Sequence, residues 1–272
     1  MSSLETIISN AFSNRDSVFS TETINAVEKT IHDLDQGKIR VAEKNSKGEW
    51  IVNQYIKKAI ILFFQIKKMV KIDCPPFEFY DKIPLKKDFK SKNIRVVPHA
   101  IARYGSFINK NSILMPSYVN IGAYVGTGTM IDTWATVGSC AQIGDNVHIS
   151  GGVGIGGVLE PVQANPVIIE NNCFIGSRCI IVEGVKVKKE AVIGAGVVLT
   201  KSTKIIDVSD SKEKHYNGII PERSVVIPGV FNKQFKAGTF QIPCAFIIGE
   251  RKESTDKKTT LNNALRDFNV SI

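Results

Sequence analysis

The chain has 272 residues, a formal net charge of +9 and 43% hydrophobic residues, so it is long enough to bury a large core. Its longest apolar run, Ala59 to Phe64, is far too short to cross a bilayer. Five cysteines without a C-x-x-C pair, and no basic region before an apolar stretch at the N-terminus, predict a cytoplasmic protein with reduced thiols that does not enter a membrane.

The first third of the chain reads as a separate unit, which we place at residues 1–93. The apolar spacing predicts an amphipathic helix over Thr21 to Gln36 and a second helix from Asn53 to about Lys68. Between them, Ile39 to Ala42 and Trp50 to Val52 are expected to pair as strands. Cys74–Pro75–Pro76 is expected to end the part that contains these helices and strands. We therefore predict a helical N-terminal domain that covers the open end of the following region.

This region also carries a dense run of lysines. We expect a solvated, lysine-rich surface here, because nucleic-acid binding would need one basic stripe with interleaved aromatic residues. The ten lysines lie at positions 57, 58, 67, 68, 71, 82, 86, 87, 90 and 92.

An apolar residue recurs at every sixth position through the centre of the chain. The first series is Ile101, Phe107, Ile113, Val119, Val125, Ile131, Val137, Ile143, Ile149 and Ile155. It restarts as Ile169, Ile175, Ile181, Val187, Ile193 and Leu199. Neither the helix period of 3.6 nor the strand period of 2 explains a step of six, whereas a hexapeptide solenoid does. We predict that each aliphatic residue points inward, and that small residues four places later, such as Cys173 and Cys179, also face the core.

The solenoid is expected over residues 94–230, with inserted loops at 156–168 and 205–221 and a last coil through Ile219 and Val225. A C-terminal cap is expected over 231–272, with a strand at Cys244 to Gly249 and a closing helix marked by Leu261, Leu265 and Phe268. The alternative is an ordinary β-sandwich of many short strands.

Long stretches of this region resemble the tetrahydrodipicolinate N-succinyltransferase family of hexapeptide-repeat acyltransferases. The matching segments are Arg40–Lys44, Arg95–Pro98, Met115–Val125, Ile131–Gly144 and Val153–Pro166. The resemblance implies a mainly β fold, a three-sided left-handed parallel β-helix with a helical N-terminal domain and a small C-terminal strand and helix cap. It also implies a cytoplasmic homotrimer with active sites between subunits, and neither a metal nor a nucleic-acid or membrane partner.

The same resemblance implies an enzyme of lysine and diaminopimelate biosynthesis. Succinyl-CoA and tetrahydrodipicolinate, in its open amino-keto form, would give N-succinyl-2-amino-6-oxopimelate and CoA. Two alternatives stay open: a related acetyltransferase that acts on another amine, and a β-helix scaffold without catalytic activity.

Three hexads make one coil, so residues 18 apart stack, and Asp132 and Ser150 should be neighbours at one corner. The resemblance assigns substrate binding or catalysis to Asp132 and substrate binding to Arg95. Arg178, alone in a stretch poor in basic residues, could bind a substrate carboxylate or form a salt bridge with a nearby acid. Ser150, Gly151 and Gly152 are expected to contact the acyl-CoA, with Gly-rich backbone amides as donors to the thioester oxygen.

One position departs from the family pattern. A glutamate proposed to act in catalysis is replaced by Ile180, so that Glu183 or Asp132 covers its role, the glutamate is dispensable, or the activity is altered. The acidic residue that the family has after Val125 is replaced by Gly126. His148 should face outward, and a catalytic role for it is a further alternative. The histidines at 32, 99 and 215 show no metal-binding spacing with it.

Overall fold

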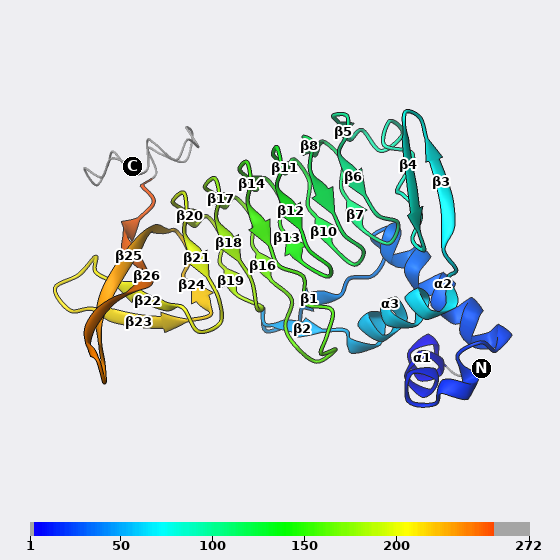
Figure 1. Ribbon diagram of the computed structural model, residues 1–272, viewed down its shortest axis with the longest axis horizontal. Helices are drawn as coiled ribbons and strands as arrows, with labels where there is room; N and C mark the ends of the chain where they lie inside the picture. Colours follow the sequence, from blue (N-terminus) through cyan, green and yellow to red (C-terminus); the bar gives the residue numbers. More distant parts are fainter. Residues whose placement is uncertain (1–2, 253–272) are drawn as a thin grey trace.

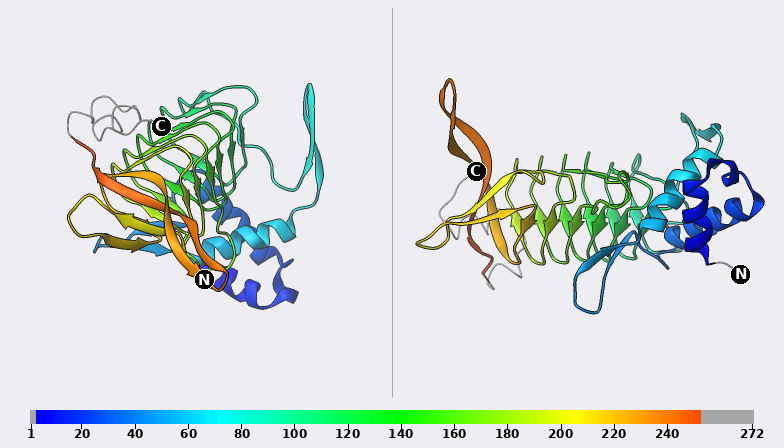
Figure 2. Two further views of the ribbon diagram at one scale, coloured as in Figure 1. Left: turned by 60° about the vertical axis from the view of Figure 1, so that its left-hand side comes forward. Right: turned by 90° about the horizontal axis from the view of Figure 1, so that it is seen from below.

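The computed structural model describes residues 3–252. A long prism of stacked coils forms its centre, helices lie at the end where the coils begin, and a twisted two-stranded ribbon projects at the other end (Figure 1, Figure 2). The coils form a left-handed parallel β-helix, which confirms the predicted fold.

Each coil contributes one short strand to each of three parallel sheets. The first sheet contains β5 (Arg95–Val96), β8 (Ile113–Leu114), β11 (Met130–Ile131), β14 (His148–Ile149), β17 (Phe174–Ile175) and β20 (Val192–Ile193). The second contains β6 (Ile101–Ala102), β9 (Tyr118–Val119), β12 (Thr136–Val137), β15 (Gly154–Ile155), β18 (Ile180–Ile181) and β21 (Val198–Leu199). The third contains β7 (Phe107–Ile108), β10 (Tyr124–Val125), β13 (Gln142–Ile143), β16 (Ile168–Ile169), β19 (Lys186–Val187) and β24 (Ile219–Ile220).

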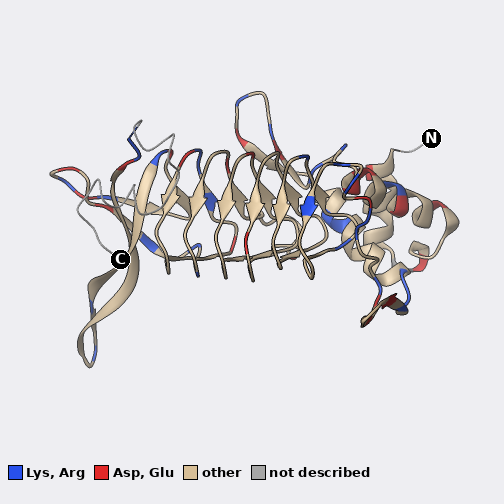
Figure 3. Cartoon of the chain, turned by 90° about the horizontal axis from the view of Figure 1, so that it is seen from above, with Lys and Arg blue, Asp and Glu red and all other residues tan. Residues whose placement is uncertain are grey.

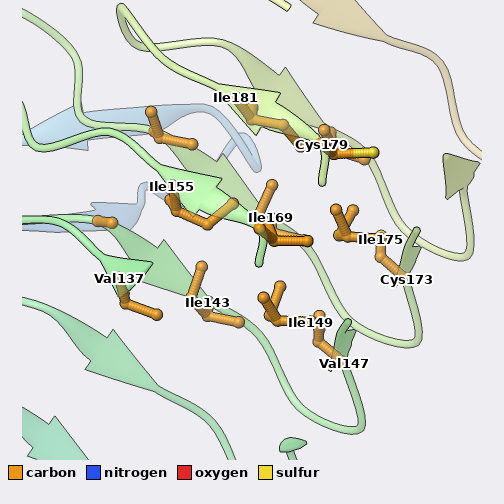
Figure 4. Close-up of a cluster of buried hydrophobic side chains, with 14 of the residues drawn as sticks. Val137, Ile143, Val147, Ile149, Ile155, Ile169, Cys173, Ile175, Cys179 and Ile181 are labelled. Carbon is orange, nitrogen blue, oxygen red and sulfur yellow. The ribbon is translucent and has the colours of Figure 1, made fainter. Parts of the chain in front are cut away.

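The core is made of stacked aliphatic columns (Figure 4). The second residue of each strand points inward, and Val137, Ile143 and Ile149 have no exposed surface. Cys173 and Cys179 are also buried, as predicted. Each fully buried aliphatic side chain contributes about 1.5–3 kcal/mol, so the repeated columns supply most of the stability of the coils.

The predicted register is wrong for the first coil. The residues expected to point inward lie on the outer side and are half-buried: Ile101, Phe107 and Ile113. Their successors are buried instead: Ala102, Ile108 and Leu114. The next inward residue after Leu114 is Val119, so this turn is one residue shorter than the others. The last coil differs in the same way, because Ile220 and Val226, rather than Ile219 and Val225, pair with the inward residues of the preceding coil.

The N-terminal region contains α1 (Leu4–Ser13), a 3₁₀ turn at Arg15–Ser17, α2 (Thr21–Asp35) and α3 (Gln54–Ile66). The last two helices were predicted and the first was not. Ser20 caps α2, since its hydroxyl accepts a hydrogen bond from the Thr23 N–H at 3.2 Å.

Two hairpins accompany these helices. Strands β1 (Ala42–Lys44) and β2 (Trp50–Val52) pair antiparallel, with β1 later in the chain than predicted. Strands β3 (Val70–Cys74) and β4 (Phe77–Asp81) form a second hairpin across Pro75 and Pro76. The prolines therefore form the turn of a hairpin and do not end this part of the chain, contrary to the prediction.

Two lysines of the predicted solvated surface are buried. Lys86 donates to a carboxylate oxygen of Asp35 at 2.7 Å and to the Ser106 carbonyl at 2.8 Å. Lys57 has no exposed surface and donates to the Ala164 carbonyl at 2.7 Å. The prediction is therefore wrong for these two, which tie the helices to the coils because a buried ammonium group needs acceptors.

The region after the coils is mostly strand. Strands β22 (Lys204–Asp207) and β23 (Lys214–Asn217) form a hairpin that begins one residue before the predicted 205–221 insertion and lies otherwise inside it. Strands β25 (Ser224–Phe235) and β26 (Gly238–Glu250) form the projecting ribbon, and the strand expected at Cys244 to Gly249 is part of β26. The closing helix expected around Leu261, Leu265 and Phe268 lies outside the described residues. None of the described helices has both the length and the apolar character needed to cross a bilayer.

Candidate active site

Most of the predicted site residues lie along one edge of the prism, where the chain passes from the first sheet to the second. We call this edge the Asp132 corner; its successive turns are Asp132–Trp134, Ser150–Gly152 and Gly176–Arg178. Backbone hydrogen bonds stack the turns, from the Gly152 N–H to the Thr133 carbonyl at 2.9 Å and from the Arg178 N–H to the Gly151 carbonyl at 3.1 Å. The corner therefore brings an acid, a glycine-rich turn and a guanidinium into consecutive coils.

Asp132 directly follows β11 and is held by its own turn. Its Oδ1 accepts hydrogen bonds from the Thr133 N–H at 2.6 Å and the Thr133 hydroxyl at 3.2 Å. Its Oδ2 has no donor within residues 3–252. One carboxylate oxygen is thus fixed while the other is available to a ligand.

Arg178 is exposed and lies directly over the preceding turn. A Cβ built on Gly152 would be 2.7 Å from Arg178 Cδ, so the glycine leaves the space that this side chain occupies. Arg178 has φ 62° and Gly152 has φ 70°, the left-handed conformation that this turn requires. No acid within the described part of the chain lies within 4.0 Å of the guanidinium, which removes the salt-bridge alternative there.

Only part of the glycine-rich turn has free backbone donors. The Gly152 N–H is donated to Thr133, and the Ser150 N–H to the Ile175 carbonyl at 3.0 Å. The Gly151 N–H has no acceptor in residues 3–252. Of the expected oxyanion donors, Gly151 is therefore the one whose amide is available.

Arg95 lies on the same sheet but not at the corner. It begins β5, pairs with Ile113 of β8, and Ile113 in turn pairs with Met130 of β11. Its exposed side chain therefore projects from the outer face, two coils before the strand that Asp132 follows.

Glu183 lies at a different edge, between the second and third sheets. Its Oε2 accepts a hydrogen bond from the Lys201 N–H at 3.1 Å, and its side chain lines a cavity of about 970 Å³ with Glu160 and Lys186. Within one chain, the structure does not bring Glu183 to Asp132. Ile180 is on the outer face of the second sheet with 38% of its surface exposed.

His148 faces outward from β14, as expected. Its ring stacks on Phe174 in the next coil at 4.9 Å with an interplanar angle of 10°. Burial lowers the pKa of His148 below its ordinary value, and the negative charge of Asp132 acts in the opposite direction. An imidazole that is neutral near pH 7 therefore lies beside the candidate acid.

No role is predicted from the sequence for Trp134, a large exposed aromatic side chain at this corner. It is 66% exposed, and its ring lies 5.5 Å from that of His99, which is 6.4 Å from Phe77 of β4. A signal for it exists in the sequence: a large aromatic residue stands at a turn position where the next two coils carry Gly152 and Arg178. The three rings form an aromatic wall beside Asp132.

Charged side chains are sparse on the coils and concentrate in the helices and hairpins (Figure 3). Within residues 3–252, no group of three or more His, Cys, Asp and Glu side chains is arranged to hold a metal ion.

Comparison with known proteins gives consistent matches along the chain. The profile described as "Tetrahydrodipicolinate N-succinyltransferase N-terminal" matches residues 3–66, and "Hexapeptide repeat of succinyl-transferase" matches residues 166–201. The chain is 52% identical to the 2,3,4,5-tetrahydropyridine-2,6-dicarboxylate N-succinyltransferase of Pseudoalteromonas translucida, covering 98% of this chain and 99% of the relative. It is 55% identical to the protein of the same name from Ralstonia nicotianae, covering 89% and 88%.

A solved structure supports the fold. A putative succinyltransferase from Campylobacter jejuni superposes with a TM-score of 0.51 at 18% identity, covering 83% of this chain and 63% of that one. The identity to full-length relatives decides the assignment: the chain belongs to the tetrahydrodipicolinate N-succinyltransferase family.

Proposed function

We propose that the chain transfers the succinyl group of succinyl-CoA to the amino group of ring-opened tetrahydrodipicolinate, giving N-succinyl-2-amino-6-oxopimelate and CoA. The observation that carries this proposal is identity above 50% over nearly the full length to enzymes named for this reaction. The chemistry of the Asp132 corner supports it.

The acceptor is a dicarboxylate with an amino group. Arg178 and Arg95, both on or next to the outer face of the first sheet, would bind its carboxylates, since guanidinium pairs bidentately with carboxylate and stays charged. The free Oδ2 of Asp132 would accept a hydrogen bond from the amine. Trp134 would shield the reacting groups from water.

The reaction forms a C–N bond and breaks the C–S bond of the thioester. The neutral amine attacks the carbonyl carbon, negative charge develops on the carbonyl oxygen, and the Gly151 N–H is placed to stabilise it. The amine loses a proton and CoA leaves as its thiol. Asp132 or the adjacent His148 would accept that proton from the amine and pass it to the departing thiolate.

We further propose that the working form is a cytoplasmic homotrimer with sites between subunits. Two features support an assembly: Glu183 and Asp132 lie at different edges of one prism, and the second sheet exposes apolar side chains at Ile180 (38%) and Val198 (49%). Sedimentation equilibrium of the full chain tests it, and a monomer at micromolar concentration would contradict it.

CoA release tests the reaction. With succinyl-CoA and tetrahydrodipicolinate, thiol release should saturate in both substrates, and mass spectrometry should find the succinylated product. Faster turnover of acetyl-CoA would favour the alternative acetyltransferase. If no acyl-CoA is consumed and none raises the melting temperature, the enzyme proposal is wrong and a scaffold remains.

A further inference from the structure

A second cavity lies away from the Asp132 corner. It has a volume of about 320 Å³ and sits between the β1–β2 hairpin and the edge where the third sheet passes to the first. Figure 2 shows this hairpin projecting from the side of the prism. Its lining includes Arg40, Lys44, Trp50, Tyr124, Asp145 and Glu170.

The guanidinium of Arg40 is held against two aromatic rings of this lining. It lies 3.5 Å from the ring centroid of Tyr124 and 5.6 Å from that of Trp50. Its Nε–H donates to Gln142 Oε1 at 3.1 Å. The amino groups Nη1 and Nη2 have no acceptor, and no carboxylate within 4.0 Å, among residues 3–252. A side chain with five N–H donors is thus held rigidly with most of them unused.

The neighbouring lysines, unlike Arg40, are paired with carboxylates. Lys44 pairs with Glu170 Oε1 at 2.7 Å, and that oxygen also accepts from Trp50 Nε1 at 2.9 Å. Although burial raises the pKa of Glu170, the hydrogen bonds from Lys44 and Trp50 hold it below its ordinary value. Lys189, also in the lining, pairs with Glu190 at 2.9 Å. Within residues 3–252, Arg40 is therefore the basic residue of this lining without an ion pair, and the negative charges of Asp145 and Glu43 act on it from a longer distance.

The partly buried guanidinium of Arg40 is energetically unfavourable when no anion is bound beside it. Burial lowers the pKa of Arg40, which reflects the cost of removing its charge from water. A partly buried charge without a partner destabilises the protein unless an anion binds it. Stacking on Tyr124 leaves the edge of the guanidinium open, and this edge matches the two oxygens of a planar carboxylate.

We propose that this cavity is a binding site for a small carboxylate, held bidentately by Nη1 and Nη2 of Arg40 and packed against Trp50 and Tyr124. Within one chain this site is separate from the Asp132 corner, because its lining comes from the edge where the third sheet passes to the first. Asp145 lines the same cavity. Its Oδ1 accepts from the Thr127 N–H at 2.7 Å, while its Oδ2 has no donor in the described residues. A ligand that also carries an ammonium group would find an acceptor there.

Tryptophan fluorescence provides a direct readout, because the chain has two tryptophans. In the Trp134→Phe variant, Trp50 is the single tryptophan, and the Asp132 corner no longer contributes tryptophan emission. Titration with sodium succinate at constant ionic strength should change its emission saturably, with a Kd on the order of 1 mM. Inorganic phosphate should bind at least about tenfold more weakly, since it lacks the planar carboxylate geometry.

Variants of Arg40 in this background decide the assignment. Arg40→Met keeps the apolar stem and should raise the Kd at least about tenfold, and Arg40→Lys, which keeps the charge, should also weaken binding. Lys47→Gln, in the β1–β2 turn outside the lining, removes the same charge and should bind as the parent does. Circular dichroism verifies that each variant is folded. No saturable change in the parent, equal affinity in folded Arg40→Met, or phosphate binding as tight as succinate would overturn the proposal.

Discussion

The side chain of Arg178 lies over Gly152 of the preceding coil, where a Cβ would approach Arg178 Cδ to 2.7 Å and Nε to 2.8 Å. Gly152→Ala should therefore displace the guanidinium and also strain a backbone with φ 70°. We expect a loss of about 1–2 kcal/mol of unfolding free energy. We also expect a KM for tetrahydrodipicolinate at least about tenfold higher, measured by CoA release.

Gly196→Ala separates the strain of the backbone from the displacement of the Arg178 guanidinium. Gly196 occupies the same turn position two coils further along with φ 74°, but nothing lies within 4 Å of its added Cβ. This variant should lose similar stability and keep the parent KM. Equal KM changes in both variants would show that backbone strain, not Arg178, is responsible.

Asp132→Asn tests the proposed acid. The amide oxygen can still accept from the Thr133 N–H, so the turn should stay folded, while the charge that orients the amine is lost. We expect kcat to fall at least ~100-fold with little change in melting temperature. Asp207→Asn, where the carboxylate accepts from the Ser209 N–H at 3.0 Å in an exposed turn, is the matched control. A near-normal rate for Asp132→Asn would remove the assigned role.

The shifted register of the first coil gives a stability test. Leu114 has no exposed surface, whereas Ile113 lies on the outer side of β8. Leu114→Ala should lose about 2–5 kcal/mol of unfolding free energy, and Ile113→Ala about 1 kcal/mol. Urea denaturation of both variants measures the difference. If Ile113→Ala lost more free energy of unfolding than Leu114→Ala, the register predicted from the sequence would be right.

The register of the first coil shows how far the fold can be predicted from the sequence. The step of six identifies the coils because aliphatic residues alternate there with polar or small ones, as at Thr136–Val137. In the first coil the pairs Phe107–Ile108 and Ile113–Leu114 are apolar at both positions, so the pattern cannot tell inward from outward. Only tertiary packing selects the buried member.

The Asp132 corner and the cavity at Arg40 are likewise predictable from the sequence only in part. Asp132 and Ser150 are 18 residues apart, so their stacking follows from the repeat. Arg178 stacks on Gly152 from 26 residues away, because the 156–168 insertion interrupts the count. The cavity at Arg40 depends on how the β1–β2 hairpin packs on the third sheet, which no local pattern encodes.

Ile180→Glu restores the carboxylate that the family pattern has at this position. Within one chain the side chain is 38% exposed on the outer face of β18, so the fold of the single chain has room for a charged group. We expect folding to be unaffected and kcat to be equal to or above that of the parent. Val198→Glu, which adds the same charge to the next strand, β21, is the control. If Ile180→Glu alone abolishes turnover, the site has been rebuilt around the isoleucine.

The stacked pair His148 and Phe174 makes stability depend on pH. Burial lowers the pKa of His148 from 6.5, so the unfolded chain binds more protons between the folded pKa and 6.5. The unfolding free energy should therefore be constant with respect to this group above about pH 6.5 and fall as the pH drops toward the folded pKa. His148→Gln cannot titrate, so its urea unfolding free energy should lack this part of the pH dependence. An NMR titration of the His148 ring in the parent should give a midpoint below 6.5. A midpoint at or above 6.5 would mean that the Asp132 charge outweighs burial, and that His148 is protonated too readily to accept a proton from the substrate amine.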